Sequence, residues 1–424
     1  MLWTTFLRQR TWQTWLYPWR GVDWILFGGV WALTLIGAMV IHSVELNKGT
    51  VESYQHLLIA VLGTAIALGL ARFNYQSLLT WHWAIYGLSM SLLLAVLFVG
   101  VSANGAERWI TIGQFNIQPS EFAKVAIILT QAAFLHRHAA NTLKGILQVL
   151  AVTAPPFLLI MMEPDLGTAL VFVVITLAMF YWANAKAGWI ILMVSPLIAA
   201  ILFALPLPWN LGLWLWLLWT VGMGIVGWHS LPLGWMGGLG AMVLNLSGAG
   251  FGQLLWRVLK DYQKDRILMF LDPHKDPLGG GYHLIQSRIA IGAGGVFGQG
   301  LHQGTQTQLG FIPEQHTDFI FSAIGEEWGF VGGLIVLILY WIVCVRLLQI
   351  ANSAREDFGS LIAIGMLAVI LFQTVVNIGM TMGLSPVTGI PLPWISYGRS
   401  AMLANYITLG FVLSVANHRP RQRY

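Results

Sequence analysis

The chain has 424 residues, of which 57% are hydrophobic and only 9% are charged. This composition excludes an ordinary soluble domain and a disordered chain, and it is typical of a helical membrane protein. The formal net charge of +5 comes mostly from short loops between apolar segments, so it reflects membrane topology and does not indicate binding to nucleic acid.

The apolar segments predict about twelve transmembrane helices, because a helix needs roughly 20 mostly apolar residues to cross the hydrocarbon. Six spans are expected in the first half, at 24–42, 53–71, 77–100, 119–136, 146–162 and 165–184. Residues 187–256 contain no Asp, Glu, Lys or Arg, and prolines divide them into three further spans. The last three are expected at 328–345, 360–380 and 400–417. The expected fold class is an all-α polytopic membrane protein that forms one integral membrane domain, 1–424.

The basic residues predict the orientation, since Lys and Arg in short loops are retained on the cytoplasmic side. With both termini inside, the outer short loops hold only Lys48, Arg108 and Arg399. The inner segments hold twelve basic residues, which are Arg8, Arg10, Arg20, Arg72, Arg137, Lys144, Lys186, Arg346, Arg355, Arg419, Arg421 and Arg423. This asymmetry places the long segment 257–327 on the outer face.

Segment 257–327 is unusually rich in charge for a connection between spans. It holds eight of the 17 acidic residues and six of the 22 basic ones, interleaved with apolar stretches. The pattern predicts an ordered, partly re-entrant loop that packs over a cavity. Within it, 272–281 lacks the ligand spacing of a calcium loop, and its prolines and glycines fit successive turns better than a metal site.

Asp318 lies where this segment gives way to an apolar helix, and two interpretations follow. An Asp in this position is a favoured N-cap, which accepts a bond from the first amides of the helix. Alternatively, Phe319 and Phe321 shield the carboxylate from water and raise its basicity towards that of a general base. His316 and Glu314 are neighbours that could tune it.

A second group of polar residues is expected on the same outer side. Arg108 and Trp109 precede a span that carries Glu121 and Lys124 three residues apart, on one helix face. Charges inside a span are costly and normally face a polar interior. Glu121 and Lys124 form either a mutual structural ion pair or part of a substrate site. A third acidic turn, 163–167, is explained as a cap on the following span.

Several motifs in the expected order resemble the SEDS family (shape, elongation, division and sporulation), and together they cover nearly the whole chain. They are 108–110, 118–124, 163–168, 266–273, 281–292, 311–321, 325–329 and 391–398. Residues 301–313 are more similar to members that act in elongation than to members that act in division.

The resemblance implies a peptidoglycan glycosyltransferase that polymerises lipid II during cell elongation and shape maintenance. It implies a place in the bacterial cytoplasmic membrane and work with a class B penicillin-binding protein and the elongation machinery. The essential loop aspartate of the family matches Asp318, as the base that deprotonates a sugar hydroxyl. The diphosphate leaving group would be met by Arg108, Lys124, Arg266 or a divalent cation such as Mg²⁺. The remaining residues expected to shape the site are Trp109, Glu121, Gln286, His316 and Ser396.

Two departures from the family pattern limit what the resemblance implies. The family usually has ten spans, so we expect an extra helical hairpin within 205–250. Arg399 stands where the family usually has Gly, and no role is assigned to it. The alternatives are a lipid II flippase, because charged residues inside a bundle also describe a lipid pathway, a division-type polymerase, and a noncatalytic scaffold.

Overall fold

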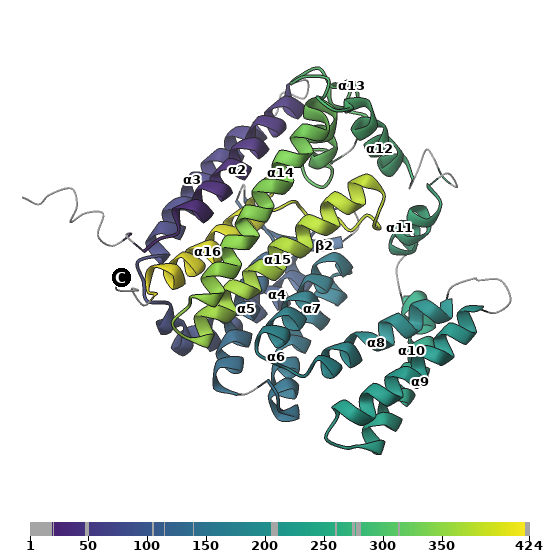
Figure 1. Cartoon of the computed structure of the whole chain (residues 1–424). Coiled ribbons are helices and arrows are strands. Elements are labelled where there is room, and N and C mark those ends of the chain that lie inside the picture. The colour runs from purple at the N-terminus through teal and green to yellow at the C-terminus, as the bar shows by residue number, and fades with distance from the viewer. Residues whose placement is uncertain are drawn as a thin grey trace, which may run out of the picture.

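In the residues that the structure describes, twelve long helices form the body of the protein (Figure 1). The computed structural model describes residues 19, 21–46, 51–103, 106–113, 115–138, 140–204, 211–258, 261–273, 276, 281–312 and 314–419. The long helices are α2 (Trp24–Glu45), α3 (Glu52–Leu70), α4 (Leu78–Val99), α5 (Pro119–Arg137), α6 (Leu143–Met162), α7 (Leu166–Trp182), α8 (Ala187–Ala204), α9 (Leu211–Ser230), α10 (Trp235–Val258), α14 (Ile320–Asn352), α15 (Asp357–Met382) and α16 (Arg399–Asn417). They match the twelve predicted spans and confirm the polytopic helical fold.

Membrane-spanning character is common among these helices. In the described part of the chain, nine of them are long and apolar enough to cross a membrane, and α7 is apolar but shorter. The other two, α5 and α10, are not among the nine. Helix α5 carries the buried charges Glu121 and Lys124, which explains why length and hydropathy alone do not identify it.

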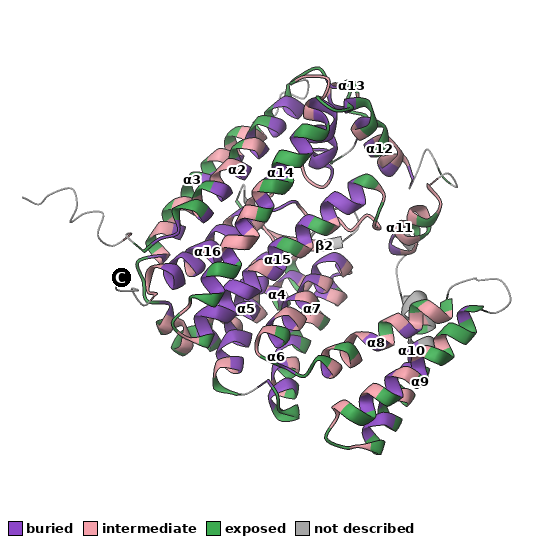
Figure 2. Cartoon of the chain, viewed as in Figure 1, coloured by how far each residue is buried: buried purple, intermediate pink, exposed green. Residues whose placement is uncertain are grey.

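The centre of the bundle is formed by α5, α15 and α16, whose residues are mostly buried (Figure 2). The surrounding helices expose apolar side chains, as expected of helices whose outer faces meet lipid. Close approach to the centre depends on small residues. A Cβ atom at Gly63 of α3 would lie 2.7 Å from the ring of Tyr406 of α16, so any larger residue there would force the two helices apart.

Helices α8, α9 and α10 pack on one another to one side of the main bundle (Figure 1). Their described contact with the main bundle runs between α7 and α8. In their interior, Asn245 of α10 donates a hydrogen bond of 3.0 Å to Ser195 of α8. The hairpin predicted within 205–250 coincides with α9 and the first part of α10, except that 205–210 lie outside the described residues. That it is an addition to a ten-helix core remains a prediction.

The prediction of an all-α chain was incomplete, because a small antiparallel sheet follows α4. Strands β1 (Val101–Ala103), β2 (Ala106–Ile112) and β3 (Phe115–Ile117) pair in the order β1-β2-β3. Strands this short carry no long alternation of apolar and polar residues from which they could have been predicted. The sheet ends directly before α5 and carries Arg108 and Trp109 on β2.

Segment 257–327 folds into short helices, as expected of an ordered loop. They are α11 (Asp261–Leu271), α12 (Tyr282–Gly294) and α13 (Thr305–Gln308). Residues 259–260, 274–275, 277–280 and 313 of the segment lie outside the described residues. The following helix α14 is bent at Gly329, where φ is +65°, a conformation that favours glycine. A short helical part, 320–328, therefore precedes the membrane-length part.

Candidate active site

Asp318 lies in a tight turn directly before α14. The backbone amides of Thr317, Asp318 and Phe319 all donate to the carbonyl of Glu314. Helix α14 has Phe319 at its N-cap position and no side-chain cap. The prediction that Asp318 caps this helix is therefore wrong, because the turn takes the Asp318 side chain elsewhere.

The carboxylate of Asp318 instead faces Gly389. A Cβ atom at Gly389 would lie 3.4 Å from Oδ2 of Asp318 and 3.8 Å from Nη1 of Arg266. The carboxylate of the turn and the guanidinium of α11 thus approach the same glycine, whose φ of +71° holds the backbone in a left-handed conformation. A Cβ atom at position 389 would be in ordinary van der Waals contact with both groups, so the left-handed backbone, and not a lack of space, opposes a side chain there.

The surroundings of Asp318 make it a stronger base. Removal from water raises its pKa to about 6, and Arg266 opposes this rise. Glu314 and Asp165 raise the pKa further, while Arg108 lowers it. A carboxylate with this pKa is about 90% ionised at pH 7 and accepts a proton more readily than an ordinary Asp.

Two side chains, those of Asn377 and Ser396, bond to the backbone of this turn. Asn377 of α15 is fully buried, and its amide donates to the carbonyls of Asp318 (3.0 Å) and Ile390 (2.8 Å). The hydroxyl of Ser396 donates to the carbonyl of Thr317 at 2.6 Å. Ser396 therefore stabilises the turn through a hydrogen bond, and its contact with substrate remains a prediction.

His316 points away from the carboxylate that it was expected to tune. Its Nε2 lies 3.4 Å from Glu52 at the start of α3, and its carbonyl accepts a bond from the amide of Tyr397. A different histidine, His283 of α12, stacks on Phe319 with ring centroids 5.9 Å apart. Burial lowers the pKa of His283, which favours a neutral imidazole beside the turn.

Arg108 holds the acidic turn that leads into α7. It donates to the carbonyl of Glu163 at 3.3 Å and to that of Pro164 at 2.5 Å. Its Nη1 lies 3.7 Å from Oδ2 of Asp165. Asp165 in turn accepts a bond from the amide of Thr168, which confirms the predicted cap on this helix. Through its effect on the pKa of Asp318, the turn belongs to the same electrostatic site.

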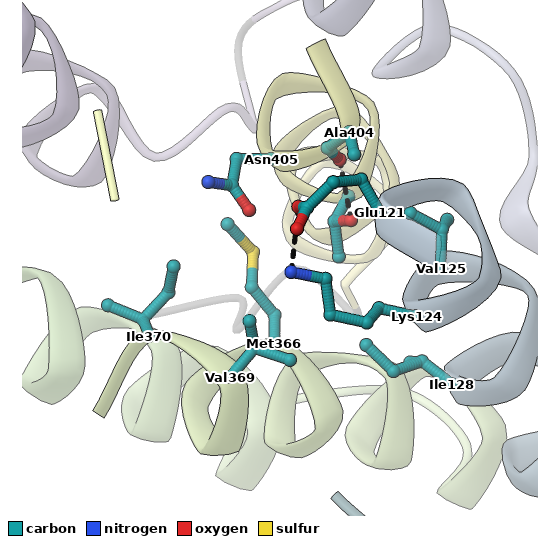
Figure 3. A pocket seen from close by; sticks show the side chains of 10 residues that line it. Glu121, Lys124, Val125, Ile128, Met366, Val369, Ile370, Ala404 and Asn405 are labelled. Carbon is teal, nitrogen blue, oxygen red and sulfur yellow. Dashed lines mark hydrogen bonds and ion pairs between the residues drawn. The ribbon is translucent and has the colours of Figure 1, made fainter. Parts of the chain in front are cut away.

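Glu121 and Lys124 lie inside the bundle rather than with Asp318. Their ion pair measures 2.7 Å, and both side chains are almost fully buried. Figure 3 shows that the pair, which belongs to α5, lies next to Met366 of α15 and Asn405 of α16. The cavity there measures about 10 Å³, which is room for about one water molecule. This geometry favours the structural ion pair, and substrate contact by either residue remains a prediction.

Two further predicted residues lie on elements that border the site. Trp109 is on β2, beside Arg108, and Gln286 is on α12; both side chains are partly buried. The sequence reasoning missed Asn377, although a polar residue within an apolar span is itself a signal of a buried polar role. It also missed Gly389 and His283, for which only the contacts in the folded chain provide a signal.

A divalent cation such as Mg²⁺ would need oxygen ligands near the charged groups of the site. Among the described residues, no group of three or more His, Cys, Asp or Glu side chains is placed to hold a metal ion. Sites for Mg²⁺ usually combine one or two carboxylates with oxygens from the substrate and water. The positive groups that the described residues place near Asp318 are Arg266 and Arg108.

These features define a polytopic membrane protein in which Asp318, Arg266, Arg108 and Asp165 form a cluster of charged groups. The chain belongs to the FtsW/RodA/SpoVE family, whose model, described as "Cell cycle protein", matches residues 23–212 and 210–421. The SEDS resemblance is thereby confirmed.

Relatives from two organisms cover most of the chain. It is 37% identical to "Peptidoglycan glycosyltransferase RodA" of Treponema pallidum (strain Nichols), over 93% of this chain and 98% of the relative. It is also 37% identical to "Peptidoglycan glycosyltransferase MrdB" of Escherichia coli (strain K12), over 84% of each chain.

Solved structures share the fold. One comes from work described as "Structural coordination of polymerization and crosslinking by a peptidoglycan synthase complex", with a TM-score of 0.68 and 30% identity over 94% of this chain and 98% of that chain. Another is the rod shape determining protein RodA of Thermus thermophilus, with a TM-score of 0.61 and 27% identity over 95% and 99%.

Proposed function

We propose that this chain is a peptidoglycan glycosyltransferase that polymerises lipid II, with Asp318 as its general base. The relatives named above are peptidoglycan glycosyltransferases. The observation that carries the assignment within this chain is the carboxylate of Asp318. It is held by a fixed turn, partly buried, and flanked by Arg266.

The reaction requires a base and a binding site for negative charge. A sugar hydroxyl of one substrate attacks the anomeric carbon of the other, and its proton passes to Asp318. The bond from the anomeric carbon to the diphosphate breaks, and the diphosphate leaves with the electron pair. Attack from the opposite face inverts the anomeric centre. Arg266 and Arg108 are the cations of this site, and guanidinium groups bind phosphate oxygens in a bidentate manner.

The placement of charge supports an outward-facing site. Asp318 precedes α14, whereas Arg346 lies near the other end of the same helix and pairs with Asp23 at 2.5 Å. Arg419 lies 3.6 Å from the same Asp23. If these basic residues are cytoplasmic, as their number in the short loops indicates, Asp318 faces the extracytoplasmic side of the bacterial cytoplasmic membrane.

A class B penicillin-binding protein is the proposed partner, together with the elongation machinery. The support is the similarity to a chain from a peptidoglycan synthase complex that couples polymerisation to crosslinking. A polymerase and a transpeptidase act on the same glycan strand, which gives a chemical reason for their association.

The test uses the purified chain, alone and with its partner, and labelled lipid II. We expect polymer from the wild type and none from Asp318→Asn. Asp357→Asn, at an exposed position at the start of α15, is the matched control and keeps wild-type activity. Exchange of lipid II between leaflets of proteoliposomes, at the same rate in wild type and Asp318→Asn and without any polymer, would instead support a flippase.

A further inference from the structure

Glu163 is a buried carboxyl group that neither the fold nor the proposed reaction explains. It ends α6, where its backbone amide bonds back to the helix. The next helix already has a cap in Asp165, so Glu163 is not needed there. The residue is only 2% exposed, and both of its side-chain oxygens are buried without a hydrogen-bond partner among the described residues.

A buried carboxyl group without partners is stable only in its neutral form, because an unpaired buried charge costs several kcal/mol. The charged groups that act on Glu163 are Asp165, at the start of α7, and Arg108, on β2. Burial and then Asp165 raise the pKa of Glu163 to about 8, against the effect of Arg108. About nine in ten molecules are therefore protonated at this position at pH 7.

Glu163 shares its electrostatic surroundings with Asp318. Asp165 and Arg108 act on the pKa of both carboxyl groups. Arg108 also bonds to the carbonyl of Glu163 itself. Asp318 has a pKa of about 6 and is mostly ionised at pH 7, whereas Glu163 has a pKa of about 8 and is mostly protonated. The two carboxyl groups on either side of Arg108 and Asp165 therefore differ in charge at this pH.

We propose that Glu163 is a neutral acid that donates a hydrogen bond to the diphosphate of the lipid-linked substrate. This inference rests on the proposed function and adds a residue to its diphosphate site. A neutral O–H donor contributes a bond without opposing the arginines, whereas an ionised Glu163 would repel the diphosphate. Glu163 keeps its proton throughout: the hydroxyl proton of the attacking sugar goes to Asp318, and the diphosphate leaves with the electron pair.

A binding measurement tests this without catalysis. Farnesyl diphosphate is titrated into the detergent-solubilised full chain between pH 7 and pH 9. The protonated fraction of a group with a pKa of about 8 falls about tenfold over this interval, so the affinity of the wild type should fall about tenfold. In Glu163→Gln, whose amide donates at every pH, the fall should disappear, while Glu163→Ala should bind more weakly than Glu163→Gln at pH 7.

Two controls show whether the pH dependence of binding requires the diphosphate of the ligand and the Glu163 side chain of the protein. Farnesol lacks the diphosphate and should show no pH dependence, and Asp357→Asn should behave as the wild type. Thermal unfolding establishes that each variant is folded. A tenfold fall that persists in Glu163→Gln, or wild-type binding by Glu163→Ala, overturns the proposal.

The same variants keep this inference distinct from the proposed base. Asp318→Asn should lose polymerisation of lipid II but retain the pH-dependent binding of farnesyl diphosphate. Polymerisation by Asp318→Asn would refute the proposed base and leave the binding result standing. Full polymerisation by Glu163→Ala, alongside an inactive Asp318→Asn, would refute the role of Glu163 alone.

Discussion

Replacing Asp318 by Asn should stabilise the protein while it removes the base. The ordinary pKa of this carboxyl is 3.8, and the fold raises it to about 6. The difference of about 2 units corresponds to ~3 kcal/mol. The folded state binds the proton more tightly than the unfolded state does, so ionised Asp318 lowers the stability at every pH above about 6. Asn has no such charge and avoids this cost.

The effect depends on pH in a defined direction. Below about pH 4 the carboxyl is protonated in both states, so the advantage of Asn should vanish. Thermal unfolding in detergent at pH 7.5 and pH 4 measures this, with Asp357→Asn as the control that shows no such gain. We expect a rise of a few degrees at pH 7.5 and little change at pH 4. A less stable Asp318→Asn at pH 7.5, or an equal gain at both values, would refute the reasoning.

Three further outcomes follow from the contacts of the site and the bundle. The acid limb of the pH–rate profile should have its midpoint at about pH 6, the pKa of Asp318. Arg266→Gln should move this midpoint upward, because Arg266 lowers the pKa of Asp318. A downward shift in the variant would contradict the proximity of the two groups. Asn377→Ala removes the side-chain donor from the part-buried carbonyl of Asp318 and from the buried carbonyl of Ile390. It should therefore destabilise the fold by about 2–4 kcal/mol, as measured by unfolding. In steady-state polymerisation it should lower kcat more than it raises KM. Lys124→Ala leaves Glu121 buried and unpaired and should lower the free energy of unfolding by about 3–5 kcal/mol. Adding Glu121→Ala should restore part of this stability. A double variant that is less stable than Lys124→Ala would argue against a structural ion pair.

The helices could be predicted from the sequence because membrane spans are specified locally. Each needs a run of apolar residues of a fixed length, and the lipid leaves the backbone no other way to satisfy its hydrogen bonds. The span that forms α5 could be predicted despite its charges, because Pro119 indicated the start of a helix and the apolar residues continued beyond Lys124. The strands before α5 escaped prediction because two of them have only three residues.

The site was predicted in part, for a different physical reason. Asp318 stood out by its position and by the resemblance to a family. Its partner Arg266 was named only as a candidate to bind the leaving group, because the two residues are 52 positions apart in the chain. The role of Gly389 depends on a backbone angle and a close approach, neither of which a single sequence encodes locally. The same holds for Glu163, whose proposed role depends on the burial of its side chain in the folded chain.

The central claim is that Asp318 accepts the proton from the attacking sugar hydroxyl. Its most direct test is the rate of glycan formation from labelled lipid II at pH 7.5 by wild type and by Asp318→Asn, both verified as folded. Removal of a general base typically costs about 10²–10⁴-fold in rate, and we predict a loss of this size. A variant that forms polymer within about threefold of the wild-type rate would contradict the account.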